Sequence, residues 1–159
     1  MKPAHLIVTL IAALGLSAAL PTAAADAHDH AGHEAAPAKL QLNAGKKWAT
    51  DAPLRQAMTA MRADLAGKLH AIHKGSLAKE DYAALGKTIE DQLGVIVSQC
   101  KLGTKADAML HIVLADLVSA ADVMQGKAAG KPAEAAHRAA LALNSYGKYF
   151  AHPGWQPLK

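Results

Sequence analysis

The chain of 159 residues is poor in cysteine and in aromatic side chains. Its single cysteine, Cys100, excludes an internal disulfide, so the fold has to be stabilised by packing alone. Phe, Trp and Tyr make up only 4% of the residues whereas alanine is abundant, which favours closely packed helices over a β-sandwich. The formal net charge of +4 is spread along the chain, so we expect no nucleic-acid partner.

Several enzyme signatures are also missing. The chain contains no H-E-x-x-H zinc motif, no G-x-S-x-G nucleophile motif and no glycine-rich phosphate loop. It has no C-x-x-C-H, which excludes covalently attached c-type haem. Glu134 and His137 form one Glu-x-x-His pair, but the second pair of a di-iron bundle never appears. We therefore predict that the protein is not an enzyme and has no catalytic residues.

Residues 1–25 have the pattern of a secretory signal peptide. Lys2 supplies the positive start, residues 6–20 form a short apolar run, and small residues follow. Cleavage after Ala25 or after Ala27 satisfies the A-x-A rule, and both sites remain open. Because the apolar run is too short for a membrane span, we expect a periplasmic protein with no membrane span in its mature form.

Residues 26–39 (DAHDHAGHEAAPAK) are predicted to form a disordered, histidine-rich tail. They have no apolar periodicity, and they carry His28, His30 and His33. Exported histidine-rich tracts of this kind bind divalent metal ions readily. The alternative interpretation is a solubilising linker in which the histidines are incidental.

Cleavage at either site places a histidine third in the mature chain. The new N-terminus reads DAH from Asp26 to His28, or HDH ending at His30. A free amine, two deprotonated amides and a third-position imidazole form a square-planar nitrogen set suited to Cu(II) or Ni(II). The DAH sequence also resembles the N-terminal copper site of serum albumins.

The sequence from residue 40 to residue 159 predicts one helical domain. Its four segments of helical periodicity cover about 51–73, 79–101, 104 to just before Gly126, and 132 to just before Pro153. In the first, Leu54, Met58 and Met61 begin an apolar stripe. Thr104 and Asp107 resemble a capping box for the third. Because the connections are short, we predict an all-α, up-down-up-down antiparallel four-helix bundle.

The fourth segment carries small residues where its inner face is expected, at Ala136, Ala140 and Gly147. They allow a neighbouring backbone to approach closely, or they leave room for a group held in the core. The first interpretation needs bulkier Leu and Met side chains on the facing helices.

This topology gathers soft metal donors at one end of the bundle. They are Met58, Cys100, His111 and His152. Their thioether, thiolate and imidazole groups suit Cu(I), zinc or a haem iron. Structural roles are the alternative: a buried free cysteine behaves as a small hydrophobe, methionine fills cores, and a histidine at a helix end binds carbonyl groups.

The opposite end of the predicted bundle holds a second group of donors. They are His70, His73, Tyr82, Met124 and His137. His70 and His73 lie three residues apart on an outward face, so they either share one metal ion or remain solvated separately.

The segments LRQAMTAMR and NSYGKY resemble the periplasmic cytochrome b562 and cytochrome c′ bundles. The resemblance implies a bundle fold and, in cytochrome b562, haem held by a Met early in the first helix and a His late in the fourth. Met58 matches the first ligand, but Gly147 stands at the natural match to the histidine. Haem binding is therefore not expected unless His152 or His111 substitutes.

The phrases LNAGKKWATDAPLRQAM, CKLGTKADAMLH and LNSYGKYFAHPGWQPL also resemble a group of small exported proteobacterial proteins, some labelled DnrO-like. This resemblance implies a location in the cell envelope. Three functions then stand as hypotheses. They are a non-catalytic metal-binding protein, with copper favoured over zinc or nickel; a structural or adaptor module that docks an envelope protein through Trp155; and a b-type haem protein.

Overall fold

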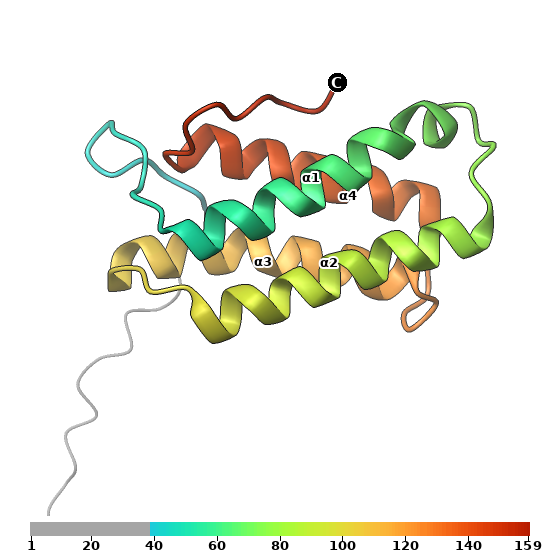
Figure 1. Cartoon of the computed structure of the whole chain (residues 1–159), viewed down its shortest axis with the longest axis horizontal. Helices are drawn as coiled ribbons and strands as arrows, with labels where there is room; N and C mark the ends of the chain where they lie inside the picture. Colours follow the sequence, from blue (N-terminus) through green and yellow to red (C-terminus); the bar gives the residue numbers. More distant parts are fainter. Residues whose placement is uncertain (1–38) are drawn as a thin grey trace, which may run out of the picture. The chain divides into compact units, whose positions relative to one another are not determined.

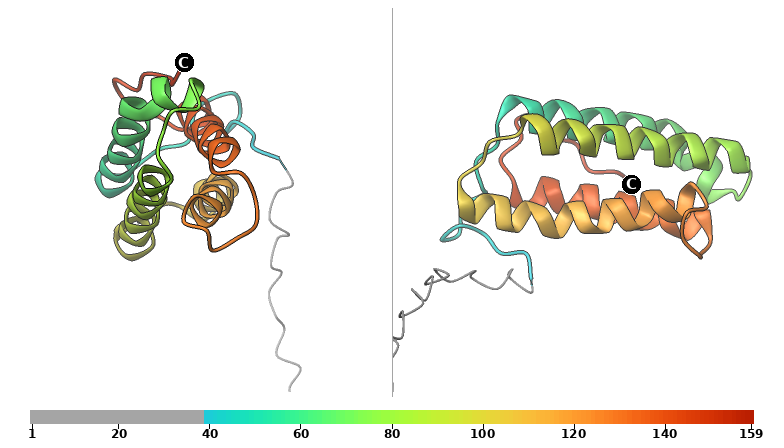
Figure 2. Two further views of the ribbon diagram at one scale, coloured as in Figure 1. Left: turned by 90° about the vertical axis from the view of Figure 1, so that its right-hand side faces the viewer. Right: turned by 90° about the horizontal axis from the view of Figure 1, so that it is seen from below.

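The computed structural model describes residues 39–159, which contain four α-helices and no β-strand. The helices are α1 (Ala52–His73), α2 (Lys79–Gln99), α3 (Thr104–Met124) and α4 (Pro132–Tyr149). They lie side by side and are joined by short connections (Figures 1 and 2). The predicted all-α four-helix fold is confirmed for this part of the chain. No helix in residues 39–159 combines the length and the apolar character that a membrane span requires.

Local capping and turn chemistry set most of the helix ends. The Asp51 side chain caps α1 by accepting a 3.0 Å hydrogen bond from the backbone N–H of Leu54. Proline lies in the first turn of both α1 and α4, where its missing N–H costs nothing. Gly75 and Gly126 follow α1 and α3 with φ of +65° and +74°, a conformation that glycine adopts without strain.

The helix bounds agree with the prediction to within about three residues, but three helix ends differ from it in detail. Helix α3 has Gly103 as its N-cap and no side-chain capping bond, so Thr104 is its first helical residue and no capping box forms. Helix α2 ends at Gln99 because Cys100 is extended and the Asp51 carboxylate accepts the next N–H, that of Lys101, at 2.6 Å. Helix α4 ends at Tyr149 because Phe150 is extended beside Trp48.

The core consists of apolar side chains from all four helices, and no polar or charged residue is buried within residues 39–159. Helix α4 contributes mainly small residues to it: Ala135, Ala136, Ala139, Ala140 and Ala142. These alanines let α4 pack more extensively on α3 than on any other helix. Gly86 has a similar role between α2 and α3, because a Cβ there would come within 2.8 Å of the Ala121 carbonyl oxygen.

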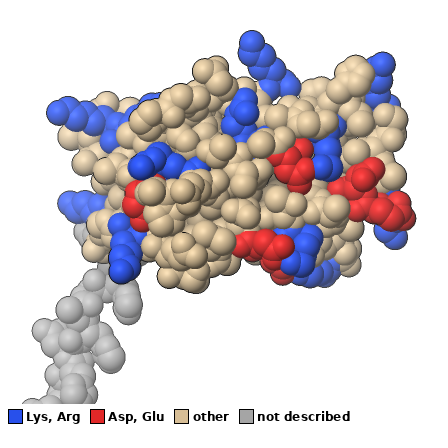
Figure 3. Space-filling model, in the orientation of Figure 1, with Lys and Arg blue, Asp and Glu red and all other residues tan. Residues whose placement is uncertain are grey.

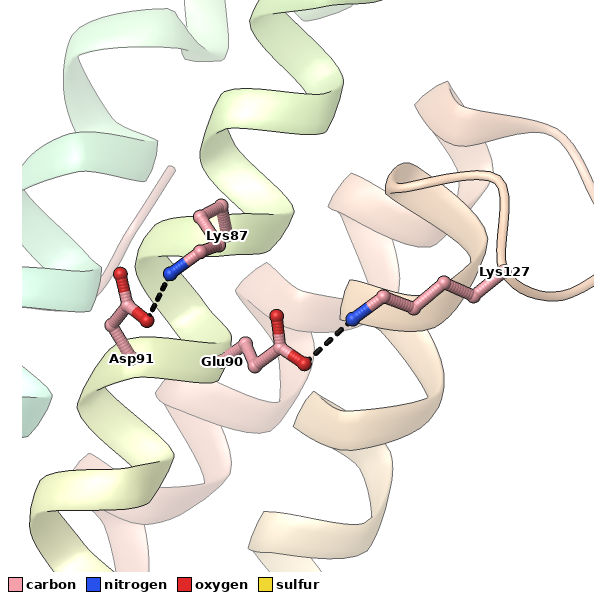
Figure 4. Close-up of polar contacts among 4 residues, drawn as sticks. All are labelled: Lys87, Glu90, Asp91 and Lys127. Carbon is pink, nitrogen blue, oxygen red and sulfur yellow. Dashed lines mark hydrogen bonds and ion pairs between the residues drawn. The ribbon is translucent and has the colours of Figure 1, made fainter.

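Charged side chains lie on the surface with both signs mixed (Figure 3). Lys87 pairs with Asp91 one turn along α2, and Glu90 of the same helix pairs with Lys127 at 2.6 Å, just after α3 (Figure 4). Exposed pairs of this kind contribute little to stability, because solvent screens the charges and holding two long side chains together costs entropy. We conclude that apolar packing, and not surface charge, holds the helices together.

Candidate functional site

The start of α1 lies against the ends of α2 and α4, and we call this region the converging end. Trp48 and Phe150 form an isolated bridge there, with the Trp48 N–H donating to the Tyr149 carbonyl at 2.9 Å. Thr50 donates a 2.6 Å hydrogen bond to the Ala151 carbonyl. The four predicted soft donors, Met58, Cys100, His111 and His152, were expected to share a site in this region.

Cys100 is half-buried at the converging end, close enough to the Asp51 carboxylate to feel its charge. Burial is the largest cause that raises the pKa of this thiol to about 12, and the negative charge of Asp51 raises it further. The thiolate is the form that binds metals and attacks electrophiles. At neutral pH, Cys100 therefore remains a protonated thiol, which is a poor metal ligand and a poor nucleophile.

His152 is held between Tyr146 and Thr59. Its Nδ1 lies 3.0 Å from the Tyr146 hydroxyl and its Nε2 lies 3.4 Å from the Thr59 hydroxyl. Burial, followed by the charge of Arg55, lowers the pKa of His152, and burial raises the pKa of Tyr146. The imidazole is therefore neutral at pH 7, and both of its nitrogens already face protein hydroxyl groups.

The other two soft donors have different surroundings. Met58 is fully buried in the core of the domain. The His111 side chain is 68% exposed, and its Nδ1 lies 2.9 Å from the Asp107 carbonyl oxygen on α3. Within residues 39–159 no three His, Cys, Asp or Glu side chains are grouped so that they could hold a metal ion. A shared site of all four donors stays a prediction without geometric support.

The predicted tail site lies outside the described residues. This applies to Asp26, His28, His30 and His33, and to the signal peptide that precedes them. Their assignment rests on sequence chemistry alone.

The segment after α4 folds back onto α1 and α4, which the sequence analysis did not anticipate. The indole of Trp155 packs on Gly147 so closely that an added Cβ would overlap it. Arg62 lies over the indole, with its Cζ 6.0 Å from the ring centroid. Leu158 is buried, and the Asn144 side chain hydrogen-bonds both its N–H and its carbonyl group. Trp155 therefore packs against the domain with its side chain only partly exposed, and its predicted docking role stays a prediction.

This packing also tests the haem hypothesis. In the cytochrome b562 resemblance, the histidine ligand would stand at Gly147, where Trp155 now covers the helix. The substitutes do not fit either, because His152 is held by two hydroxyl groups and His111 faces solvent. The residues present do not suit a b-type haem.

One pair of donors was not anticipated. His73 of α1 and His137 of α4 stack with ring centroids 5.2 Å apart and an interplanar angle of 8°. They line a hollow of about 210 Å³ together with Leu69, Ala140, Leu141, Asn144, Leu158 and Lys159. The sequence placed both histidines at one end of the bundle but associated His73 with His70, because only neighbours along one helix can be paired from spacing.

No protein-family model matches this chain, and no curated protein or solved structure is significantly similar to it. The resemblances to cytochrome b562, cytochrome c′ and the DnrO-like proteins therefore remain resemblances of short phrases and of helical pattern. The function has to be inferred from the chemistry of the residues themselves.

Proposed function

We propose that this protein is an exported, periplasmic, non-catalytic metal-binding protein, with copper favoured and zinc or nickel as alternatives. The observation that carries the proposal is the histidine that becomes third after cleavage at either Ala25 or Ala27. That position completes a square-planar nitrogen set with the amine and two amides, the arrangement that Cu(II) and Ni(II) prefer. The remaining tail histidines supply further imidazoles.

The properties of the helical domain support binding by the tail over chemistry inside the bundle. Cys100 is a protonated thiol with a pKa of about 12, and the pKa of His152 is lowered by burial. The Cys100 thiol is therefore not activated as a nucleophile. The His152 imidazole has no nitrogen free to act as a base. We also infer that the four helices alternate in direction, because short loops join them and the start of α1 contacts the ends of α2 and α4.

The proposal is tested by producing the full precursor in a Gram-negative host and recovering the periplasmic form. Its intact mass identifies the cleavage site, and a spectroscopic Cu(II) titration follows. We expect one tight equivalent with the visible band of square-planar nitrogen-bound copper. If the chain begins at Asp26, His28→Ala abolishes this equivalent; if it begins at His28, His30→Ala does so.

His33→Ala is the matched control, because His33 lies in the same tail but is never third after either cut. It should keep the tight equivalent and lose only weaker binding. A mature chain that begins elsewhere, or tight binding that survives both substitutions at His28 and His30, would overturn the proposal.

An adaptor role is the second candidate, and two exposed apolar side chains provide positions at which to test it. Val97 is 80% exposed on α2 and Leu141 is 66% exposed on α4. Capture from envelope extracts, with and without Cu(II), compares the parent with Val97→Asp and Leu141→Asp. Metal-independent capture of one protein that either substitution removes would favour this role. Capture that requires Cu(II) and the tail would favour metal handling.

The haem hypothesis is tested separately, by mixing the purified protein with equimolar haem. We expect no Soret band of a ligated b-type haem, because Trp155 covers the helix at Gly147. A stable band that is lost in His152→Ala would contradict this expectation.

A further inference from the structure

The stacked histidines lie across two helices that are far apart in the sequence. His73 is in the last turn of α1 and His137 is in the second turn of α4, and both residues are exposed. Within residues 39–159 the histidine hydrogen bonds belong to His111 and His152, so the rings of this pair have no hydrogen-bond partner. Two accessible imidazoles with open nitrogens are brought together by the tertiary fold alone.

The separation of the two rings suits a shared metal ion. A tetrahedral ion bound by one nitrogen from each imidazole, at about 2.0–2.1 Å, holds the ring centroids about 5 Å apart. The observed separation of His73 and His137 is 5.2 Å. Their planes are parallel, so each ring has to turn about χ2 to direct a nitrogen at the ion. That torsion is soft, and exposure leaves room for the turn.

The groups around the His73–His137 pair also affect how favourably a cation would bind there. His73 ends α1, and the C-terminal end of a helix carries about half a negative charge from its unpaired carbonyl groups. The hollow beside the rings is lined by the polar side chain of Asn144 and by the apolar residues Leu69 and Leu158. Lys159 also lines it, and its positive charge works against a cation, so coordination by the two imidazoles has to outweigh that repulsion.

We propose that His73 and His137 form a second metal site, which binds a divalent ion of the zinc or copper class across α1 and α4. Neutral imidazole is a preferred ligand of both ions. Water completes the coordination shell, since two protein ligands leave positions open. The site is separate from the tail site proposed above, and an ion held there links the two helices and stabilises the folded state.

The experiment uses the full exported chain carrying His28→Ala, His30→Ala and His33→Ala, so that the tail no longer competes for metal. Zinc chloride is added, and thermal unfolding is followed by circular dichroism while NMR follows the imidazole resonances. We expect Tm to rise with zinc, with shifts confined to His73 and His137. His73→Ala and His137→Ala should each remove the rise in Tm.

His70→Ala is the matched control, because His70 is exposed one turn earlier on α1 and is absent from the stacked pair. It should keep the full response. Since all three histidines are exposed, each variant should fold with the parental Tm when zinc is absent. Loss of the response in His70→Ala but not in His137→Ala would place the ion on α1 alone and overturn the proposal.

A zinc response that survives both His73→Ala and His137→Ala, or no response in the tail-substituted chain, would also overturn it. Failure here leaves the tail proposal standing, because that proposal is measured with Cu(II) on a chain whose tail is intact. Conversely, a tail without a tight Cu(II) equivalent does not affect the zinc response of the bundle.

Discussion

At the converging end, the segments before α1 and after α4 pack against the helix ends. At the opposite end, the helices are joined only by the α1–α2 and α3–α4 turns. Trp48, Phe150 and Trp155 all lie at the converging end, in contacts between residues up to about a hundred positions apart. The opposite end is formed by residues 74–78 and 125–131. Gly75, Tyr82, Val123 and Gly130 there help to line an open hollow of about 600 Å³.

The two ends are therefore stabilised by different means. Long-range contacts constrain the converging end, and removing one leaves neighbouring aromatic rings without a partner. The opposite end depends on local turns, in which Gly75 and Gly126 adopt positive φ. Within residues 39–159 the backbone hydrogen bonds between segments far apart in the sequence lie at the converging end, and regions held by fewer such contacts open at a lower free-energy cost. Substitutions at the converging end should accordingly have larger effects than matched substitutions at the opposite end.

The largest expected effect comes from Tyr146→Ala. This fully buried ring stacks on Phe150, meets Trp155 edge-on and lies 3.0 Å from His152 through its hydroxyl. Removing it should reduce the free energy of unfolding by about 3–5 kcal/mol, as large-to-small core substitutions do. Urea denaturation measures the change.

Tyr82→Ala is the matched substitution at the opposite end, where the ring borders the open hollow. We expect a loss of about 2 kcal/mol, because the site opens to solvent and no closed cavity remains. Equal losses for the two tyrosines would contradict the difference between the ends.

The next effect is that of Gly147→Ala. Alanine normally stabilises a helix relative to glycine by about 1 kcal/mol, but here its Cβ would overlap the Trp155 indole. Displacing the indole should turn that gain into a net loss of about 1–2 kcal/mol, typical of an overpacked site. Acrylamide quenching of tryptophan fluorescence should increase as Trp155 leaves α4.

Gly94→Ala is the control, because nothing lies within 4 Å of a Cβ at this position in α2. It should stabilise the domain by about 0.5–1 kcal/mol and leave quenching unchanged. A similar gain for Gly147→Ala would show that Trp155 is not held on α4.

A smaller loss, about 1 kcal/mol, is expected for Asp51→Ala, which removes an N-cap. Burial by itself would raise the pKa of the Asp51 carboxyl. The hydrogen bonds from the N–H groups of Lys101 and Leu54 have the larger combined effect and lower this pKa below its ordinary value of 3.8. Because the folded-state pKa is the lower one, the contribution is complete above pH 3.8 and is lost as pH falls through the folded-state value.

The measurement compares Asp51→Ala with the parent by urea denaturation at neutral pH and again below pH 3.8. The difference should shrink at the lower pH, when the carboxylate is protonated. Asp91→Ala is the control: its pair with Lys87 is exposed and screened by solvent, so its removal should change stability little at either pH (Figure 4). A difference for Asp51→Ala that is independent of pH would show that its charge is not involved.

The smallest effect is a gain at the opposite end. Ala78 is the N-cap of α2, is extended, and makes no side-chain capping bond. Ala78→Ser supplies a hydroxyl acceptor for the N–H groups of the first turn and should add about 0.5–1 kcal/mol. Ala52→Ser, directly after the filled cap of α1, should change little. If Ala78→Ser has no effect on Tm, the opposite end is not limited by local capping.

Much of the fold could be predicted because its signals are local. Asp51 with Pro53, and Gly75 after the last apolar residues, define the bounds of α1 by interactions within one turn. The capping box predicted at Thr104 does not form. The spacing of Thr104 and Asp107 matches the motif, but the helix begins one residue earlier than the motif requires, with Gly103 as its N-cap. Helices α2 and α4 end slightly earlier than predicted because distant residues, Asp51 and Trp48, determine their ends.

The sequence by itself determined the four helices, the apolar faces that pack together, and the histidine spacing of residues 26–34, since periodicity, caps and chain order are local properties. Only the tertiary structure decided the surroundings of each donor. It sets Cys100 near the charge of Asp51, encloses His152 between hydroxyl groups, and stacks His73 on His137. Such pairings join residues that no local pattern relates, so they appear only when the packed core fixes which helix faces meet.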